Sequence, residues 1–482
     1  MRSVIKSIND MANLYPNREA YIGINEKVTY KELNEKISKM LIFLSKIENN
    51  IDQICTICQK ESNAVAILLA TSLLNIDNSI IPYDAHQYTK IEDVEFTNDV
   101  IVISEEDFDK NTTILTDVSN HFINSPIEKI NIKDIVEKES LKDIQLFFEK
   151  SCSPAKLILY TSGTTGKSKG VIVSYNQFNF INVPITEQNE GINIITKGSS
   201  VRPFLGTILS TLKEGKTILQ IDVDNCFDMT NLCERVDIES LTTNIYGIKK
   251  FISIAKKNKH LYNRIPLVTI TGGVMHQFLR EKSVEVFPNA KLLDLYGQTE
   301  LGLISVIDST EWCENEYCVG TPSFFVDVTI KDLHSHMELK EREIGHITVK
   351  SNHKFKGYSN HTAIALDEVY TGDLGYLKDS KLYLLGRISD CLKYGDSWLL
   401  KRDIECKLSE GFSEKFQVLV RDGRFYIILE RHSSRIEKII EDKFSSFKQL
   451  IQIKIVQENK KSSPDSCVNM LYNVFTISTY QN

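Results

Sequence analysis

Three absences narrow the classes of protein to which this chain can belong. It has no uninterrupted apolar run of about 18 residues or more, so we expect no membrane span. Residues 1–10 lack the apolar core of a secretory signal peptide, which predicts a cytoplasmic protein. The formal net charge of −7 argues against nucleic acid as the main partner.

The sequence also lacks the cysteine pattern of a zinc site. Its ten cysteines are scattered, and the one C-x-x-C pair, Cys55 and Cys58, belongs to an apolar run that predicts a buried strand. Without a second pair, we expect small buried residues and no metal. His334 and His336 flank a serine in a polar turn, and we expect both on the surface without a ligand.

The length and the composition predict a globular protein of more than one domain. A chain of 482 residues exceeds the usual size of one compact domain. Hydrophobic residues make up 42% and charged residues 25%, which is ordinary for a globular chain. Helical and strand patterns alternate through residues 1–150, and residues 64–74 form a strongly apolar helix. This alternation predicts parallel sheets with helices on both faces.

The most informative stretch is residues 160–170, a polar loop between two apolar runs at 157–160 and 171–173. The pattern predicts two short strands joined by a tight turn. The loop contains three glycines, five hydroxyl side chains and two lysines. Glycines bring backbone N–H groups close to an anion, hydroxyls add donors, and lysines add positive charge. This combination suits a polyphosphate.

Two better-known phosphate loops do not fit this stretch. A Walker loop needs four residues between its glycines, whereas Gly166 follows Gly163 after only two. A dinucleotide-binding loop opens a long helix, whereas here a strand follows. The remaining alternative is a polar hairpin that binds nothing.

On these residues the chain resembles the signature loop of the adenylate-forming superfamily. That superfamily comprises acyl-CoA synthetases, non-ribosomal peptide adenylation domains and luciferases. The resemblance implies that the loop binds the pyrophosphate of ATP as it leaves. The residues implied for this role are Thr161, Ser162, Thr164, Thr165 and Lys169.

Two later strands end in residues suited to a ligand. Residues 267–270 end at a Thr-Gly-Gly triplet, and residues 292–295 end at Tyr-Gly-Gln-Thr-Glu. Ligands of open α/β sheets bind at the carboxyl ends of strands. The resemblance implies that Gly272, Gly273, Asp294, Tyr296 and Gly297 bind the nucleotide. It further implies that Thr299 contacts phosphate, that Glu300 holds Mg²⁺, and that Leu295 and Leu303 contact the substrate.

Two more motifs follow in the order of the superfamily. Residues 325–330 and 345–349 alternate as antiparallel strands do, and they precede Thr-Gly-Asp at 371–373. The resemblance implies that Asp373 accepts hydrogen bonds from the ribose hydroxyls. It also implies that Arg387 contacts ribose or phosphate, with a hinge near 387–390 in which Ser389 takes the hinge position.

Arg202 marks the predicted substrate region. Its spacing from Gly215 resembles that of the amino-acid-adenylating branch, where an aspartate at this position binds the α-amine of the substrate. A guanidinium repels an ammonium group, so we expect a substrate other than an α-amino acid bound in the usual way. Arg202 could hold a second carboxylate instead. The alternative is a surface arginine whose alignment has slipped.

The C-terminal region departs most from the superfamily. Its last motif normally carries a lysine that bridges the acyl carboxylate and ATP, and the matching position here holds Cys467. Loss of one aimed donor typically costs roughly 10²–10³ in rate. Lys460 or Lys461 is a candidate replacement. A covalent role for Cys467 is an alternative to an incidental cysteine.

The predicted fold is α/β. A large N-terminal domain, residues 1–385, contains two mixed or parallel sheets with flanking helices and a β-rich subdomain. A small, mobile α+β domain, residues 386–482, follows it. The predicted function is ATP- and Mg²⁺-dependent activation of a small carboxylic acid as an acyl-adenylate, with transfer to the phosphopantetheine thiol of a carrier protein. The alternatives are an acyl- or aryl-CoA ligase and a nucleotide-binding scaffold without full catalysis.

Overall fold

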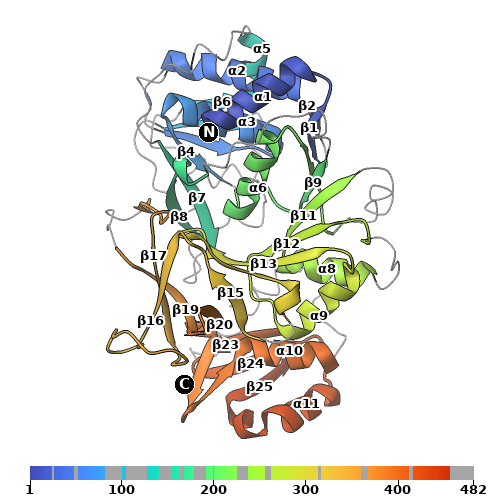
Figure 1. The fold of residues 1–482 in the computed structure, drawn as a ribbon, viewed down its shortest axis with the longest axis vertical. Coiled ribbons are helices and arrows are strands. Elements are labelled where there is room, and N and C mark those ends of the chain that lie inside the picture. Colours follow the sequence, from blue (N-terminus) through green and yellow to red (C-terminus); the bar gives the residue numbers. More distant parts are fainter. Residues whose placement is uncertain are drawn as a thin grey trace.

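The computed structural model describes most of the chain between residues 1 and 455. The described residues are 1–23, 26–47, 51, 53–81, 100–104, 128–139, 147, 155–162, 168–178, 191–198, 200–224, 237–255, 262–312, 316–359, 367–411 and 416–455. Figure 1 shows an elongated molecule, with helices α1 to α3 at one end and helix α11 at the other. No helix among these residues is both long and apolar enough to span a membrane.

The N-terminal sheet has seven strands in the order β18-β8-β7-β4-β3-β5-β6. Strands β3 to β7 pair in parallel, whereas β8 and β18 are antiparallel additions at one edge. The strands are β3 (Gln53–Ile57), β4 (Asp77–Ile80), β5 (Val100–Ser104), β6 (Glu128–Asn131), β7 (Lys156–Ser162), β8 (Ser168–Ser174) and β18 (Gly357–Tyr358). Cys55 lies fully buried in β3, as its apolar run predicts.

The larger sheet has thirteen strands and changes from parallel to antiparallel pairing at β13. Its parallel part is β1 (Glu19–Gly23), β9 (Ile192–Ile195), β10 (Thr217–Gln220), β11 (Ile238–Asn244), β12 (Leu267–Thr271) and β13 (Lys291–Gln298), with β2 (Glu26–Thr29) antiparallel at the edge. Its antiparallel part is β14 (Gly302–Asp308), β15 (Cys318–Pro322), β16 (Val326–Lys331), β17 (Gly345–Ser351), β19 (Val369–Lys378) and β20 (Lys381–Arg387).

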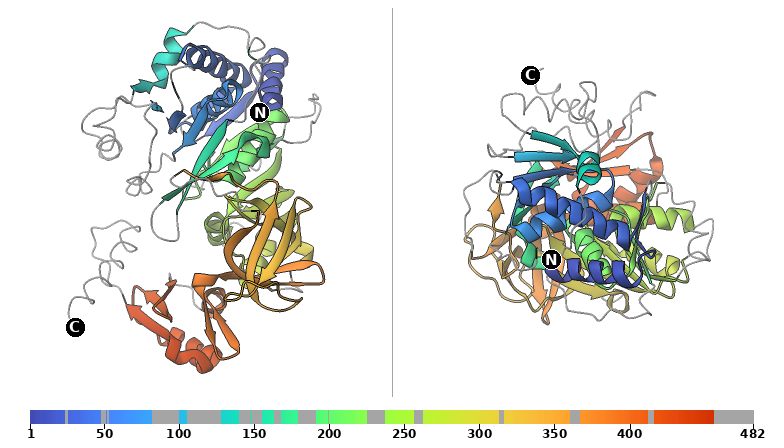
Figure 2. Two further views of the ribbon diagram at one scale, coloured as in Figure 1. Left: turned by 90° about the vertical axis from the view of Figure 1, so that its left-hand side faces the viewer. Right: turned by 90° about the horizontal axis from the view of Figure 1, so that it is seen from above.

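The helices form the layer between and around these sheets (Figure 2). Helix α3 (Glu61–Leu74) is buried on nearly every side, which explains why its sequence is apolar all round. It shares one core with α1 (Arg2–Leu14), α2 (Tyr30–Ile47) and α6 (Arg202–Lys213). Helices α8 (Ile245–Ala255) and α9 (Gln277–Val286) cover the parallel part of the larger sheet in a second core. The short α5 (Ile132–Lys138) packs on α2.

The C-terminal segment has a core of its own. A hairpin of β21 (Cys391–Tyr394) and β22 (Ser397–Leu400) leads into α10 (Lys401–Gly411). A three-stranded sheet of β23 (Phe416–Arg421), β24 (Arg424–Leu429) and β25 (Ile451–Ile455) then packs with α11 (Ser434–Phe444). The predicted α/β architecture is confirmed. The boundary at residue 386 and the hinge stay predictions, and a 3-10 turn, Ile388–Asp390, occupies that stretch.

Helix α10 is tied to the large sheet by a partly buried polar contact. The Tyr317 hydroxyl, just before β15, donates a hydrogen bond to Asp403 Oδ1 at 3.0 Å. Burial raises the pKa of Asp403 to about 6, although this hydrogen bond and the nearby Arg402 act in the opposite direction. The carboxyl group therefore keeps its proton to a higher pH in the folded protein than in the unfolded chain.

We expect stability to depend on pH through Asp403. An unfolded aspartate loses its proton near pH 4, whereas Asp403 loses it near about pH 6. The contribution of Asp403 to the free energy of unfolding is therefore complete below about pH 4 and is lost as the pH rises through about 6. The expected change is on the order of 3 kcal/mol. Urea unfolding of the wild type and of Asp403→Asn between these pH values measures it. An energy difference between the two proteins that stays constant with pH would contradict the expectation.

Candidate functional site

A cavity of about 350 Å³ lies where β12 and β13 end. These strands pair in parallel, so their carboxyl ends meet at the same edge of the sheet. The cavity brings together six of the seven residues predicted to bind the nucleotide and one predicted substrate residue. They are Gly272, Gly273, Tyr296, Gly297, Asp373, Arg387 and Leu295.

The two glycines after β12 allow the chain to turn beside helix α8. Gly272 has a φ of +73°, a conformation that side chains other than glycine rarely adopt. A Cβ on Gly273 would lie 2.6 Å from the Ile245 side chain, so any larger residue would force that side chain to shift. The glycines therefore leave backbone, and not side chains, facing the cavity.

The carboxylate of Asp373 is the most tightly held polar group in the cavity. Its Oδ2 accepts hydrogen bonds from the Tyr296 hydroxyl at 2.6 Å and from Gln298 Nε2 at 2.8 Å. Arg387 Nε lies 3.2 Å from its Oδ1. Burial raises the pKa of Asp373, and the positive charge of Arg387 opposes that rise. The carboxylate is thus fixed in one orientation inside the cavity.

The segment of β19 that carries Asp373 is held from its two neighbouring strands. Gly372, with a φ of +77°, donates its N–H to His346 Nε2 on β17 at 2.9 Å. Arg387 Nη1, at the end of β20, donates to the Thr371 carbonyl at 2.8 Å. Both contacts fix the Thr-Gly-Asp segment, which the sequence predicts as a ribose-binding motif.

A second group of residues lies near the place where β8 pairs with β18. Strands β7 and β8 form the predicted hairpin, with Thr161 paired to Lys169. Lys169 Nζ lies 5.6 Å from the ring centre of Tyr358, and the Tyr358 hydroxyl donates to Glu300 Oε1 at 2.9 Å. Burial raises the pKa of Tyr358, which keeps this hydroxyl protonated as a donor. Thr164 and Thr165 lie outside the described residues, as does the side chain of Ser162.

Arg202 is the first residue of α6 and is 7% exposed, so the alternative of a surface arginine is wrong. Its guanidinium donates to the carbonyls of Thr299 and His353 and to Gln177 Oε1, the last at 3.1 Å. Burial lowers its pKa to about 10, and nearby Glu300 partly offsets that shift. Arg202 does not line the cavity, and its hydrogen bonds hold the turn before Glu300.

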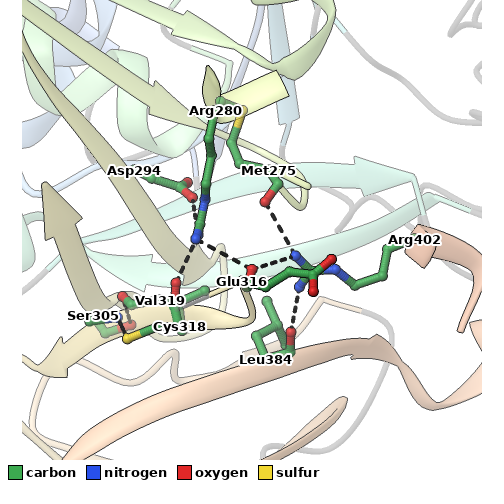
Figure 3. A network of polar contacts seen from close by, with 10 residues as sticks. Met275, Arg280, Asp294, Ser305, Glu316, Cys318, Val319, Leu384 and Arg402 are labelled. Carbon is green, nitrogen blue, oxygen red and sulfur yellow. Dashed lines mark hydrogen bonds and ion pairs between the residues drawn. The ribbon is translucent and has the colours of Figure 1, made fainter. Parts of the chain in front are cut away.

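Among the residues predicted to bind the nucleotide or the substrate, two others do not line the cavity. Leu303, in β14, is 45% exposed, and its role as a substrate contact stays a prediction. Asp294 points to the opposite side of β13, where its Oδ2 pairs with Arg280 Nη2 at 3.2 Å (Figure 3). Arg280 also donates to the Cys318 carbonyl at 2.7 Å. The alternation of side chains along a strand explains why Asp294 and its neighbour Leu295 face opposite ways. The structure gives no support to Asp294 as a nucleotide ligand.

The cavity also contains polar residues that the sequence motifs did not indicate. They come from helices α8 and α10 and from β13, and they are Lys249, Gln298, Lys401, Arg402 and Glu405. Lys401 Nζ lies 3.7 Å from Asp390 Oδ2. In the sequence, only the Lys-Arg pair at 401–402 could have indicated these residues. The position of this pair beside the cavity depends on contacts between distant parts of the chain.

Comparison with known proteins relates most of the chain to one family. A family model described as AMP-binding enzyme matches residues 8–359. The 2-succinylbenzoate–CoA ligase of Bacillus subtilis is 23% identical over 418 residues, covering 82% of this chain and 80% of that protein. A D-alanine–D-alanyl carrier protein ligase of Streptococcus pyogenes is 24% identical, covering 85% and 83%. A plipastatin synthase of Bacillus subtilis is 23% identical, but the match covers only 15% of its length.

Solved structures share the fold. The O-succinylbenzoate-CoA synthetase of Bacillus subtilis in complex with ATP and magnesium ion has a TM-score of 0.72 at 20% identity, covering 94% of this chain and 96% of that one. The A-PCP structure of McyG with phenylalanyl-adenylate has a TM-score of 0.75 at 15% identity, covering 99% and 84%. At these identities the likeness concerns the fold alone.

Asp373→Asn is expected to weaken binding of AMP by roughly 10- to 100-fold. The amide cannot accept from Tyr296, Gln298 and Arg387 as the carboxylate does, and hydrogen bonds to charged groups contribute about 1.5–3 kcal/mol each. Titration calorimetry with AMP measures the change. Asp327→Asn, on an exposed position of β16, is the matched control. Equal affinity of Asp373→Asn and the wild type would overturn the assignment.

Arg280→Met is expected to lower the free energy of unfolding by about 3–5 kcal/mol, because it leaves the buried Asp294 charge without its partner. Urea unfolding measures the loss. Lys282→Met, on the same helix, removes a partly exposed pair with Glu285 and should cost about 1 kcal/mol or less. If both variants lose the same small amount, the buried pair is not what holds α9 to β13.

Proposed function

Because this chain belongs to the family of AMP-binding enzymes, we propose that it activates a carboxylic acid with ATP as an AMP-forming acid–thiol ligase. The observation that carries the proposal is the cavity at the ends of β12 and β13, in which Tyr296 and Arg387 both contact the Asp373 carboxylate. A carboxylate held in one orientation suits a ribose diol, which offers two hydroxyl donors. The glycine backbone and Tyr296, which line the same cavity, suit a purine.

In the proposed reaction, a substrate carboxylate oxygen bonds to the α-phosphorus of ATP. The bond from that phosphorus to the bridging oxygen breaks, and pyrophosphate leaves with the electron pair. Lys169, on the hairpin, supplies positive charge to the leaving group, together with the hydroxyls predicted in the loop. Catalysis then consists of positioning and charge stabilisation.

Glu300 fits the predicted Mg²⁺ ligand in its chemistry. A carboxylate is a hard oxygen donor, which Mg²⁺ accepts together with phosphate oxygens and water. The Tyr358 hydroxyl bonded to Oε1 fixes the orientation of this carboxylate. Bound Mg²⁺ would neutralise charge on the phosphates. Thr299, the residue before it, is proposed to contact phosphate, while its carbonyl is bound by Arg202.

The buried charge of Arg202 supports a substrate without an α-ammonium group. It lies at the position where the amino-acid-adenylating branch has an aspartate, and it adjoins Glu300. An ammonium group placed here would meet a like charge in a water-poor setting, where repulsion is strongest. We therefore infer an acid whose α-carbon carries no amine.

The proposed acceptor is the phosphopantetheine thiol of a carrier protein. The likeness to a D-alanyl carrier protein ligase and to an A-PCP structure supports it, while the likeness to a CoA ligase supports free CoA as the alternative. Residues 386–482 are proposed to move as a small domain about the hinge at 387–390. A cytoplasmic location would supply the ATP.

A nucleotide-binding scaffold is the second candidate function. The observation that favours it is Cys467 at the position of the superfamily's lysine, which lies outside the described residues. The described part of the chain does offer cations to the cavity, in Lys249, Arg387 and Lys401. Lys401, partly screened by Asp390, is a candidate source of the missing charge.

Carboxylate-dependent exchange of labelled pyrophosphate into ATP tests the proposal. We expect exchange with at least one acid from a panel of aryl, fatty and dicarboxylic acids, and none with α-amino acids. Glu300→Gln, as the matched variant, should lower the rate by roughly 10²-fold or more. Tight binding of ATP without exchange for any acid would favour the nucleotide-binding scaffold over the ligase. Exchange confined to α-amino acids would contradict the inference from Arg202.

A further inference from the structure

Arg402, the second residue of α10, is 6% exposed and donates three hydrogen bonds to backbone carbonyls (Figure 3). Its Nη1 donates to Leu384 at 2.7 Å. Its Nη2 donates to Glu316 at 2.9 Å and to Met275 at 3.3 Å. The guanidinium carbon also lies 4.6 Å from the ring centre of Tyr317.

The acceptors of Arg402 belong to different walls of the nucleotide cavity. Met275 comes directly after the segment 272–274, which lines the base side. Leu384 lies on β20, three residues before Arg387, and lines the ribose side. One planar guanidinium therefore joins two walls that are more than one hundred residues apart in sequence, and Arg402 itself lines the cavity between them.

The arrangement requires an arginine. A guanidinium presents five N–H donors in a rigid plane, whereas a lysine ammonium is a single point with three donors on a flexible stem. Burial lowers the pKa of Arg402, as does the neighbouring charge of Arg280. A buried charge needs hydrogen-bond partners, and here three main-chain carbonyls accept bonds from Nη1 and Nη2. The hydrogen bonds to main-chain carbonyls thus offset the desolvation of the buried Arg402 charge.

We propose that Arg402 is a positioning residue that sets the separation of the base-side and ribose-side walls, and so makes helix α10 part of the nucleotide site. The proposal rests on the proposed function and deepens it. Arg402 follows the predicted hinge at 387–390, whereas its three acceptors precede it. Rotation of α10 about that hinge would break all three bonds. By linkage, a nucleotide that needs the walls in place favours the orientation in which Arg402 is bound.

The test compares AMP binding by the full chain carrying Arg402→Met, Arg402→Lys or Lys407→Met. Lys407 lies on the same helix, pairs with Glu410 and does not line the cavity. We expect Arg402→Met to raise the AMP dissociation constant on the order of 10- to 100-fold. Arg402→Lys should recover part of the affinity, and Lys407→Met should match the wild type.

Urea unfolding of the same proteins separates positioning from loss of fold. If Arg402→Met is folded at the assay temperature and binds AMP as tightly as the wild type, the inference is wrong while the proposed function stands. If the wild type itself fails to bind AMP, the proposed function and the inference both fail. Should Arg402→Met not fold, Arg402→Lys decides, because an unchanged dissociation constant in that variant contradicts a need for the planar fork.

For an active enzyme, steady-state exchange adds a further readout. Misplaced walls weaken the ground state and the transition state alike, so the KM for ATP should rise in Arg402→Lys with kcat nearly unchanged. A fall in kcat at constant KM would instead place Arg402 at the reacting atoms and overturn the positioning role.

Discussion

The carbonyl of Glu316 lies between two buried guanidinium groups, and the proposed nucleotide cavity depends on this junction (Figure 3). Arg280 Nη1 approaches it at 3.4 Å from α9, and Arg402 Nη2 at 2.9 Å from α10. Two like charges so close repel, yet each has further acceptors, and Arg280 also has the Asp294 carboxylate. The junction thereby joins β13, β15, β20 and two helices behind the cavity. Because its partners are backbone carbonyls, it fixes main-chain positions and not only side chains.

Three consecutive residues at the end of β13, Gln298, Thr299 and Glu300, are each bonded to a different part of the fold. Gln298 donates to Asp373 and to the Thr371 carbonyl, which joins the turn to the ribose side. The Thr299 carbonyl is bound by Arg202 from α6. Glu300 accepts from Tyr358 through its side chain and from the Phe355 N–H through its carbonyl, the latter at 2.6 Å. A different element thus holds each of these three residues. A shift of any one of these elements would change the positions of both the proposed ribose side and the proposed phosphate side.

The sequence sufficed to predict those parts of the site that are formed by residues close together in the chain. Residues 160–170 identified the hairpin and the superfamily, which the family match confirms. The glycines after β12 and Tyr296 near the end of β13 were predicted to share a strand edge, and they line one cavity. Contacts that cross the fold were not indicated by the sequence. Asp294 follows the same pattern as its neighbours but faces Arg280, and nothing local distinguishes Arg402 from the other charges of an amphipathic helix.

The predicted alignment with the adenylate-forming superfamily gives this chain an unusual distribution of positive charge. It puts Arg202, which is buried, where an acid is usual in one branch, and Cys467 where a lysine is usual. Arg202 cannot replace that lysine, since its donors are directed at Thr299, Gln177 and His353. Arg202 interacts with Glu300 by charge alone, without a hydrogen bond between them among the described contacts. A nearby cation lowers the negative potential at a carboxylate and so weakens its hold on Mg²⁺. Lys169 is proposed to supply charge to the leaving group, and Lys401, which follows the predicted hinge and lies in the cavity wall at the start of α10, is proposed as a further source of charge at the phosphates.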